Sequence, residues 1–172
     1  MNPMRNVEVE KLTLNIGAGK SQDKLEKGMK LFKIITGVEP IKTITKKRIP
    51  GWGLRPGLPI GCKTTIRKGK VSELIASLIK AKDSLLQDSN FDSEGNVSFG
   101  IHEYIDIPNV KYVPEIGIIG LQVCITLRRK GYRIKNRKQQ RKSIPKRHRI
   151  TKEEAKKFME SSFGVKIKEE EE

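Results

Sequence analysis

The stretch LQVCITLRRKG, residues 121–131, shows the clearest strand pattern in the sequence and decides the fold class. Apolar side chains occupy every second position of its first half, a period of two that is typical of a β-strand with one buried face. The alternate positions include Gln122, Thr126 and Arg128, where a strand covered on both faces would be apolar. The stretch therefore predicts a sheet that buries one face and leaves the other open and basic.

The segment IGCKTTIRKG, residues 60–69, alternates in the same way. Its polar positions, Lys63, Thr65 and Arg67, share one face, while the opposite face starts at Ile60. Both strands thus place polar or basic residues on the face that a covered sheet would keep apolar.

Helix end signals are strong in two places. Ser21 is a suitable N-cap for a helix that Gly37 ends, and Thr151 with Glu154 forms a capping box for a helix that Gly164 ends. Helical periodicity also marks a third segment between these two. The predicted helices cover residues 21–36, 71–86 and 151–163, and KIKEEEE, residues 166–172, is predicted as a frayed acidic tail.

Five strands and three helices without strict βαβ alternation predict an α+β fold. We expect a mainly antiparallel five-stranded sheet with helices packed on one face and the other face open and basic. A slip in the alternation at Glu10 and Lys11 indicates a bulge in the first strand. The chain length fits one domain over residues 1–172, with a basic extension at 128–149 and an acidic tail at 169–172. The other three strands are predicted at residues 7–16, 40–47 and 97–105.

The net charge of +16 is concentrated in two blocks. Residues 42–70 hold nine Lys or Arg and no acid, and residues 128–149 hold twelve and no acid. The remaining residues hold fifteen bases against twenty acids, so the rest of the chain is mildly acidic. Positive charge that is segregated in this way is typical of a surface that binds phosphates.

Other classes of protein fit poorly. No apolar run approaches the roughly 20 residues of a membrane span, and the first ten residues lack the apolar core of a signal peptide. With two distant cysteines and two histidines we expect neither a zinc site nor a cofactor. We expect Cys62 and Cys124 to pack as small residues at the core edge in a reducing cytosol.

The segment NIGAGKS, residues 15–21, resembles the end of a nucleotide-binding loop but fails both known patterns. Leu14 stands where the Walker pattern needs its first glycine, and Gln22 stands where the dinucleotide pattern needs its third. A nucleotide-using enzyme is therefore disfavoured. We expect instead a tight turn whose backbone amides meet an RNA phosphate.

The basic extension, residues 128–149, lies between a strong strand and a well-capped helix, so the chain must return to the core. Tyr132, Ile134, Ile144 and Pro145 are candidates to anchor it. We predict that it becomes ordered on RNA and that Tyr132 stacks on an unpaired base. Its predicted RNA contacts are Arg128, Arg129, Lys130, Tyr132, Arg133, Lys135, Arg137, Lys138 and Arg141.

The only tryptophan, Trp52, lies in a loop rich in proline and glycine, residues 49–59. That composition makes burial of its side chain inside the domain unfavourable. An exposed Trp52 beside Arg48 and Arg55 indicates a finger that stacks on a nucleotide base.

Several long blocks together resemble ribosomal protein five of the large subunit, the 5S-rRNA-binding family, in its archaeal and eukaryotic form. They are VEKLTLNIGAGK, LPIGCKTTIRKGK, VSFGIHEYIDIP, LRRKGYRIKNRK and HRITKEEAKKFMESSFGV, and they span nearly the whole chain. The basic extension marks the archaeal and eukaryotic branch, and the local lysine content suits an archaeon.

The resemblance implies a non-enzymatic protein of the cytoplasmic ribosome. Its implied partners are 5S rRNA in the central protuberance, large-subunit rRNA, P-site tRNA, a small-subunit protein at an intersubunit bridge and neighbouring central-protuberance proteins. Family positions that bind 5S rRNA fall on Asn15, Trp52, Thr65 and Arg67, and a family glutamine falls on Val38. The predicted 5S rRNA set is Lys11, Asn15, Lys42, Lys63, Thr65 and Arg67, and the predicted tRNA-contacting loop holds Arg48, Trp52 and Arg55.

A protein that binds DNA or chromatin is the alternative, because positive blocks suit any polyanion. The sequence lacks a helix-turn-helix or zinc module, and its bases lie on predicted strands and loops rather than on one recognition helix.

Overall fold

The computed structural model describes residues 2–108 and 110–168. The predicted acidic tail at 169–172 lies outside the described residues. The strands are β1 (Val7–Gly17), β2 (Ile41–Ile44), β3 (Pro59–Ile66), β4 (Leu85–Gln87), β5 (Val97–Ile101), β6 (Leu121–Arg129) and β7 (Lys166–Lys168). The helices are α1 (Gln22–Thr36), α2 (Val71–Lys80), α3 (Arg133–Asn136) and α4 (Lys152–Phe163), joined in places by single 3-10 turns.

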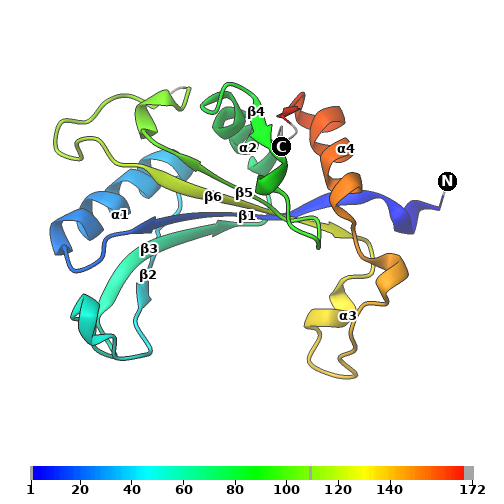
Figure 1. The fold of residues 1–172 in the computed structure, drawn as a ribbon, viewed down its shortest axis with the longest axis horizontal. Coiled ribbons are helices and arrows are strands. Elements are labelled where there is room, and N and C mark those ends of the chain that lie inside the picture. Colours follow the sequence, from blue (N-terminus) through cyan, green and yellow to red (C-terminus); the bar gives the residue numbers. More distant parts are fainter. Residues whose placement is uncertain (1, 109, 169–172) are drawn as a thin grey trace. The chain divides into compact units, whose positions relative to one another are not determined.

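The predicted α+β fold is confirmed (Figure 1). Five strands form one sheet in the order β2-β3-β1-β6-β5, and β4 pairs with β7 in a parallel two-stranded sheet. The described residues form two compact units. Unit 1 consists of the described residues of three segments, Met1–Leu12, Arg67–Phe99 and Cys124–Glu172. Unit 2 consists of the described residues of two segments, Thr13–Ile66 and Gly100–Val123.

In unit 2, α1 packs on the covered face of the sheet (Figure 1). A Cβ at Gly28 of α1 would lie 3.0 Å from Sγ of Cys62 and 3.5 Å from Ile16, so helix and strands approach closely at this glycine. Ser21 caps α1 by accepting a hydrogen bond from the Lys24 amide, and Gly37 ends it in the left-handed conformation. Both end signals are confirmed.

In unit 1, α2 and α4 contribute buried apolar residues, among them Ile75, Leu78 and Met159. The predicted capping box of α4 is confirmed, because Thr151 accepts from the Glu154 amide and the Glu154 carboxylate accepts from the Thr151 amide. Gly164 ends the helix at φ 64°.

Two boundaries predicted from the sequence are wrong. The second helix ends at Lys80 rather than near Leu86, because Asp83 and Ser84 have φ values of 56° and 57°, which no right-handed helix accommodates. The segment after them is β4, and it pairs with residues 166–168, which were predicted as part of a frayed tail. Leu86 lies opposite Ile167 in this pair and is buried.

The strand predicted over residues 97–105 is also shorter, because β5 ends at Ile101. A 3-10 turn follows and buries Tyr104, whose hydroxyl accepts a hydrogen bond from the Val113 amide at 2.9 Å. The slip at Glu10 and Lys11 lies inside β1, which continues to Gly17. The bulge there stays a prediction.

Candidate nucleic-acid interface

The open face of the sheet in unit 2 is polar, as predicted. On β1, Leu14 and Ile16 are buried while Asn15 between them is partly exposed. The Asn15 amide donates to Oε1 of Gln122 on β6 at 3.4 Å, which places both side chains on the same face. On β3, Lys63 is exposed and Thr65 is half-buried. Unit 2 therefore presents amide, hydroxyl and ammonium groups, which suit phosphate and 2′-hydroxyl contacts.

Lys42 of the predicted RNA-binding set lies on the other face. In the antiparallel β2–β3 pair, Lys42 lies opposite Cys62 and Ile41 lies opposite Lys63. Residues directly opposite each other point to the same side of a sheet, and Cys62 is buried against α1. Lys42 is thus exposed at the sheet edge on the helix side, and Ile41 is its counterpart on the open face.

In unit 1 the open face is mixed in charge rather than purely basic. Lys11 and Arg67 line one open cavity together with Glu10. Arg128 lies 3.8 Å and Lys130 lies 4.0 Å from the Glu8 carboxylate. These pairs are exposed and at the long end of the ion-pair range, so they contribute little to stability.

Arg129 is the buried member of the predicted RNA-binding set. Its side chain is 6% exposed, and its guanidinium donates to the Glu154 carboxylate of α4. Its inward position on β6 and its ion pair with the half-exposed Glu154 leave this side chain almost no free surface. Arg129 therefore belongs to the packing of unit 1, and we remove it from the interface.

The loop between β2 and β3 exposes Trp52, as the sequence predicts. A 3-10 turn, Pro50–Trp52, is closed by the backbone pairing of Ile49 with Leu54, and Leu54 anchors the loop by being buried. Trp52 itself is 68% exposed, an unusual value for the largest apolar side chain. Arg48 and Arg55, the basic residues predicted beside it, are exposed as well.

In the turn at NIGAGKS, where we expected backbone amides to meet a phosphate, two of these amides are already hydrogen-bonded within unit 2. The Ala18 and Gly19 amides both donate to the Ile60 carbonyl, at 2.9 and 3.1 Å. The Lys20 side chain extends to Gly53 instead, and its Nζ occupies the space that a Cβ at residue 53 would need. The glycines thus serve the contact between this turn and the β2–β3 loop within unit 2.

The basic extension is anchored by Tyr132 and Ile144, while two other predicted anchors, Ile134 and Pro145, are exposed. The Tyr132 hydroxyl donates to the His148 carbonyl at 3.1 Å and accepts from the Ile150 amide at 3.2 Å. Burial raises the pKa of this hydroxyl. The extension therefore has a fixed path from β6 back to α4. Its exposed bases include Lys130, Arg133, Lys135, Lys138 and Arg141, and Arg137 is half-buried with its Nε bonded to the Gln140 carbonyl.

The sequence analysis did not predict that His148, Glu94 and Arg149 make contacts that hold the basic extension in place. The His148 ring packs edge-on against Tyr132 at 5.8 Å and contacts the Lys130 carbonyl at 3.0 Å. Arg149 lies 3.4 Å from the Glu94 carboxylate, 55 residues away in the chain. Such long-range pairs carry no periodic signal, so only the folded chain reveals them.

Neither a metal cluster nor a long apolar helix stands out in the described ranges. No group of three or more His, Cys, Asp or Glu there could hold a metal ion. Within the same residues, no helix is long and apolar enough to cross a membrane. Cys62 is buried, which raises the pKa of its thiol to about 11, and Cys124 is partly buried with its pKa raised for the same reason. Both are free thiols.

An α+β sheet with a polar open face, an exposed tryptophan loop and a folded basic extension is typical of a protein that binds structured RNA. Comparison with known proteins identifies the family. A family model described as ribosomal protein L5 matches residues 2–55, and a second one, described as the C-terminus of the same ribosomal family, matches residues 59–166.

Archaeal relatives match over nearly the full length. Large ribosomal subunit protein uL5 of Sulfolobus acidocaldarius is 48% identical over 168 residues, covering 98% of this chain and 94% of that protein. The protein of the same name from Nanoarchaeum equitans is 46% identical, with 96% and 98% covered, and that from Methanobrevibacter smithii is 42% identical, with 96% and 97% covered.

The chain therefore belongs to the ribosomal protein L5 family, in its archaeal form. This confirms the resemblance seen in the sequence. It is a structural protein of the large subunit of the cytoplasmic ribosome and not an enzyme.

Proposed function

We propose that this protein binds 5S rRNA through the open face of its sheet and attaches it in the central protuberance of the large subunit. The observation that carries the proposal is the polar face of unit 2, where Asn15 and Gln122 are hydrogen-bonded to each other and Lys63 of β3 is exposed. Thr65 continues this face on β3, and Arg67 directly follows that strand. Unit 2 contributes Asn15, Lys63 and Thr65 to the proposed contacts, and unit 1 contributes Lys11 and Arg67.

Three further contacts belong to the proposal. The loop with Arg48, Trp52 and Arg55 touches P-site tRNA, because an exposed tryptophan between guanidinium groups offers both stacking and phosphate contacts. The basic extension holds large-subunit rRNA through its exposed Lys and Arg side chains. The protein also meets a small-subunit protein at an intersubunit bridge and neighbouring proteins of the central protuberance. We propose that the whole chain works as one RNA-binding domain.

A competition experiment tests the proposal against general binding to polyanions. The full chain is titrated into labelled 5S rRNA at moderate salt, and unlabelled 5S rRNA or duplex DNA of equal length is added as competitor. We expect 5S rRNA to compete at least tenfold more effectively than duplex DNA, because strand-borne polar groups match RNA shape and 2′-hydroxyls. Equal competition would favour the DNA-binding alternative and overturn the proposal.

Lys63→Ala provides the site-directed arm of this experiment. It is compared with Lys33→Ala, which removes the same charge from an exposed position of α1, on the helix that covers the opposite face of unit 2. Binding of 5S rRNA should weaken only for Lys63→Ala. Equal losses would show that net charge rather than the open face determines affinity.

A further inference from the structure

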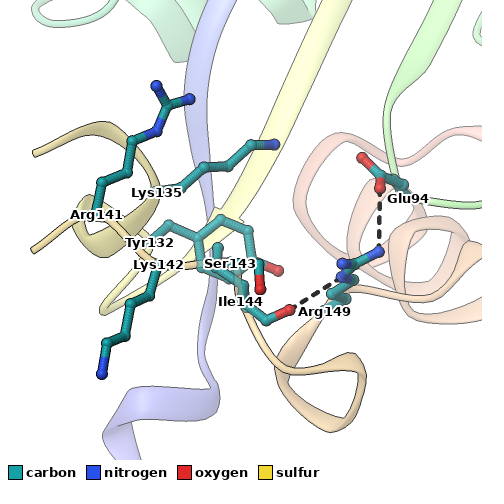
Figure 2. A pocket seen from close by; sticks show the side chains of 8 residues that line it. All are labelled: Glu94, Tyr132, Lys135, Arg141, Lys142, Ser143, Ile144 and Arg149. Carbon is teal, nitrogen blue, oxygen red and sulfur yellow. Dashed lines mark hydrogen bonds and ion pairs between the residues drawn. The ribbon is translucent and has the colours of Figure 1, made fainter.

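Unit 1 contains a cavity of about 520 Å³ inside the basic extension (Figure 2). Its volume lies in the range of sites that hold one small molecule, so a single nucleotide fits and a duplex does not. Four basic residues line it, and Figure 2 shows Lys135 and Arg141 across the view from Arg149. Tyr132 and Ile144 add an aromatic and an aliphatic surface between them.

The walls of this cavity are fixed by hydrogen bonds. Tyr132 is held through its hydroxyl by the backbone of His148 and Ile150. Arg149 donates from Nε to the Ile144 carbonyl at 3.2 Å, and the Lys142 amide donates to the Ile134 carbonyl at 3.3 Å. A ligand therefore meets preformed walls, which reduces the entropy lost on binding.

The chemistry of the lining matches the parts of a nucleotide. The side chains of Lys135 and Arg141 make no contact with an acid in the described structure, and both are exposed, so they are available to a phosphate. The tyrosine ring offers a surface on which a base can stack. An unpaired nucleotide provides both partners for this lining, a phosphate and a flat base beside it.

One acidic residue, Glu94, also lines the cavity. A carboxylate there would repel a phosphate, so it must face the base. It only accepts hydrogen bonds, through two oxygens, and its contact with Arg149 uses Oε1 at 3.4 Å, long for a charged pair. Guanine offers two adjacent N–H donors on its Watson–Crick edge, which a carboxylate can accept together. The other three bases offer no such pair of donors on that edge.

We infer that this cavity receives one unpaired guanine nucleotide of RNA. The base lies on Tyr132 with its Watson–Crick edge at Glu94, and the adjoining phosphate lies at Lys135 and Arg141. The inference rests on the proposed RNA-binding function and deepens it, because it assigns base selectivity to an extension that otherwise contributes only charge.

The test uses the full chain and four fluorescein-labelled pentaribonucleotides, UUGUU, UUAUU, UUCUU and UUUUU, in anisotropy titrations at low ionic strength. We expect UUGUU to bind about tenfold more tightly than the other three, the effect of one additional charge-assisted hydrogen-bonded contact. Equal affinity for all four oligonucleotides would overturn the inference.

Glu94→Gln distinguishes recognition of the base from general electrostatics. It should abolish the preference for UUGUU while UUUUU binds as before or more tightly, because a negative charge has been removed. If Glu94 acted only by repulsion, all four affinities would rise equally. Glu103→Gln, an exposed acid in unit 2, is the matched control and should leave the preference intact.

Glu94→Gln also removes the ion pair with Arg149 and can thereby loosen the extension. Arg141→Ala is therefore a second, independent test of the cavity. Arg141 is exposed, so its replacement spares the packing; it should weaken all four oligonucleotides several-fold at an unchanged melting temperature. A guanine preference that survives Glu94→Gln, or unchanged affinities in Arg141→Ala, would place the binding elsewhere and overturn the inference. The same proteins are titrated with 5S rRNA: binding without discrimination among pentamers refutes the pocket alone, whereas no binding refutes the proposed function.

Discussion

Lys42 lies directly opposite Cys62 in the antiparallel pairing of β2 with β3, and Cys62 is buried against α1. Lys42 and Lys63, which were predicted together as 5S rRNA contacts, therefore lie on opposite faces of the sheet. The consequence is a difference in RNA binding. We expect Lys63→Ala to weaken binding of 5S rRNA by about 1 kcal/mol and Lys42→Ala to change it by less than half of that. Filter-binding titrations of both variants decide it, and a larger loss for Lys42→Ala would contradict the assignment of faces.

Arg67 directly follows β3 and is exposed. We expect Arg67→Ala to weaken binding of isolated 5S rRNA by about 1–3 kcal/mol, the range for a charged hydrogen bond left unmade. Because one phosphate contact is lost, the slope of log affinity against log salt should also fall by about one. A salt titration measures both quantities. Wild-type affinity would remove Arg67 from the site, and Lys33→Ala serves again as the control for charge.

Trp52 contributes little to the fold, because most of its side chain is in solvent. Trp52→Ala should therefore change the free energy of unfolding by no more than about 0.5 kcal/mol while impairing placement of P-site tRNA on reconstituted ribosomes. Leu54→Ala, two residues further and buried, is the contrasting variant and should destabilise the loop. A loss of thermal stability in Trp52→Ala, with normal tRNA placement, would refute the role of the loop.

Glu154 has two structural roles at once: it closes the capping box of α4 and neutralises the buried Arg129. Glu154→Ala should destabilise unit 1 by about 2–4 kcal/mol, since a missing cap costs about 1 kcal/mol and an unpaired buried charge costs more. Glu153→Ala removes the same charge from an exposed position in the same turn and should be nearly neutral. Urea unfolding curves of both variants provide the comparison, and equal midpoints would show that Arg129 does not depend on Glu154.

The parts of this structure that the sequence predicts are those with a repeating local signal. β1, β3 and β6 alternate over several periods, and α1 and α4 carry caps at both ends, so their positions follow from the pattern. β4 and β7 have three residues each and pair across almost half the chain, which leaves no period to detect. The failure at Arg129 has a different origin. The alternation of β6 places residue 129 inward, but the charge of its side chain led to its assignment to the RNA-binding surface.

The candidate site divides in the same way. The open face with Lys63 and Thr65 follows from strand alternation, and the exposure of Trp52 follows from the composition of its loop. The cavity in the extension requires Glu94, which comes from a loop between β4 and β5. No spacing in the sequence connects it with Arg149, since only the folding of unit 1 brings the two together.

Asp88 makes unit 1 sensitive to acid. Its carboxylate accepts from Lys152 of α4 at 2.5 Å and is also paired with Lys156, one turn further along that helix. The hydrogen bond from Lys152, with that from Lys156, holds the pKa of Asp88 below its ordinary value of 3.8. Because the folded state releases this proton more readily than the unfolded chain does, the stabilisation is complete above about pH 4 and is lost as the pH falls through the folded pKa.

Asp88→Asn should therefore lower the melting temperature by a few degrees at pH 7, and the difference from the wild type should shrink as the pH falls below about 4. Melting curves between neutral pH and the acid limit of folding measure it. Asp83→Asn is the matched control, because Asp83 is exposed and its left-handed backbone is one that asparagine also adopts. A difference that stays constant over the whole pH range would mean that Asp88 stabilises unit 1 by packing rather than by its charge, because only the charged form attracts the two lysines of α4.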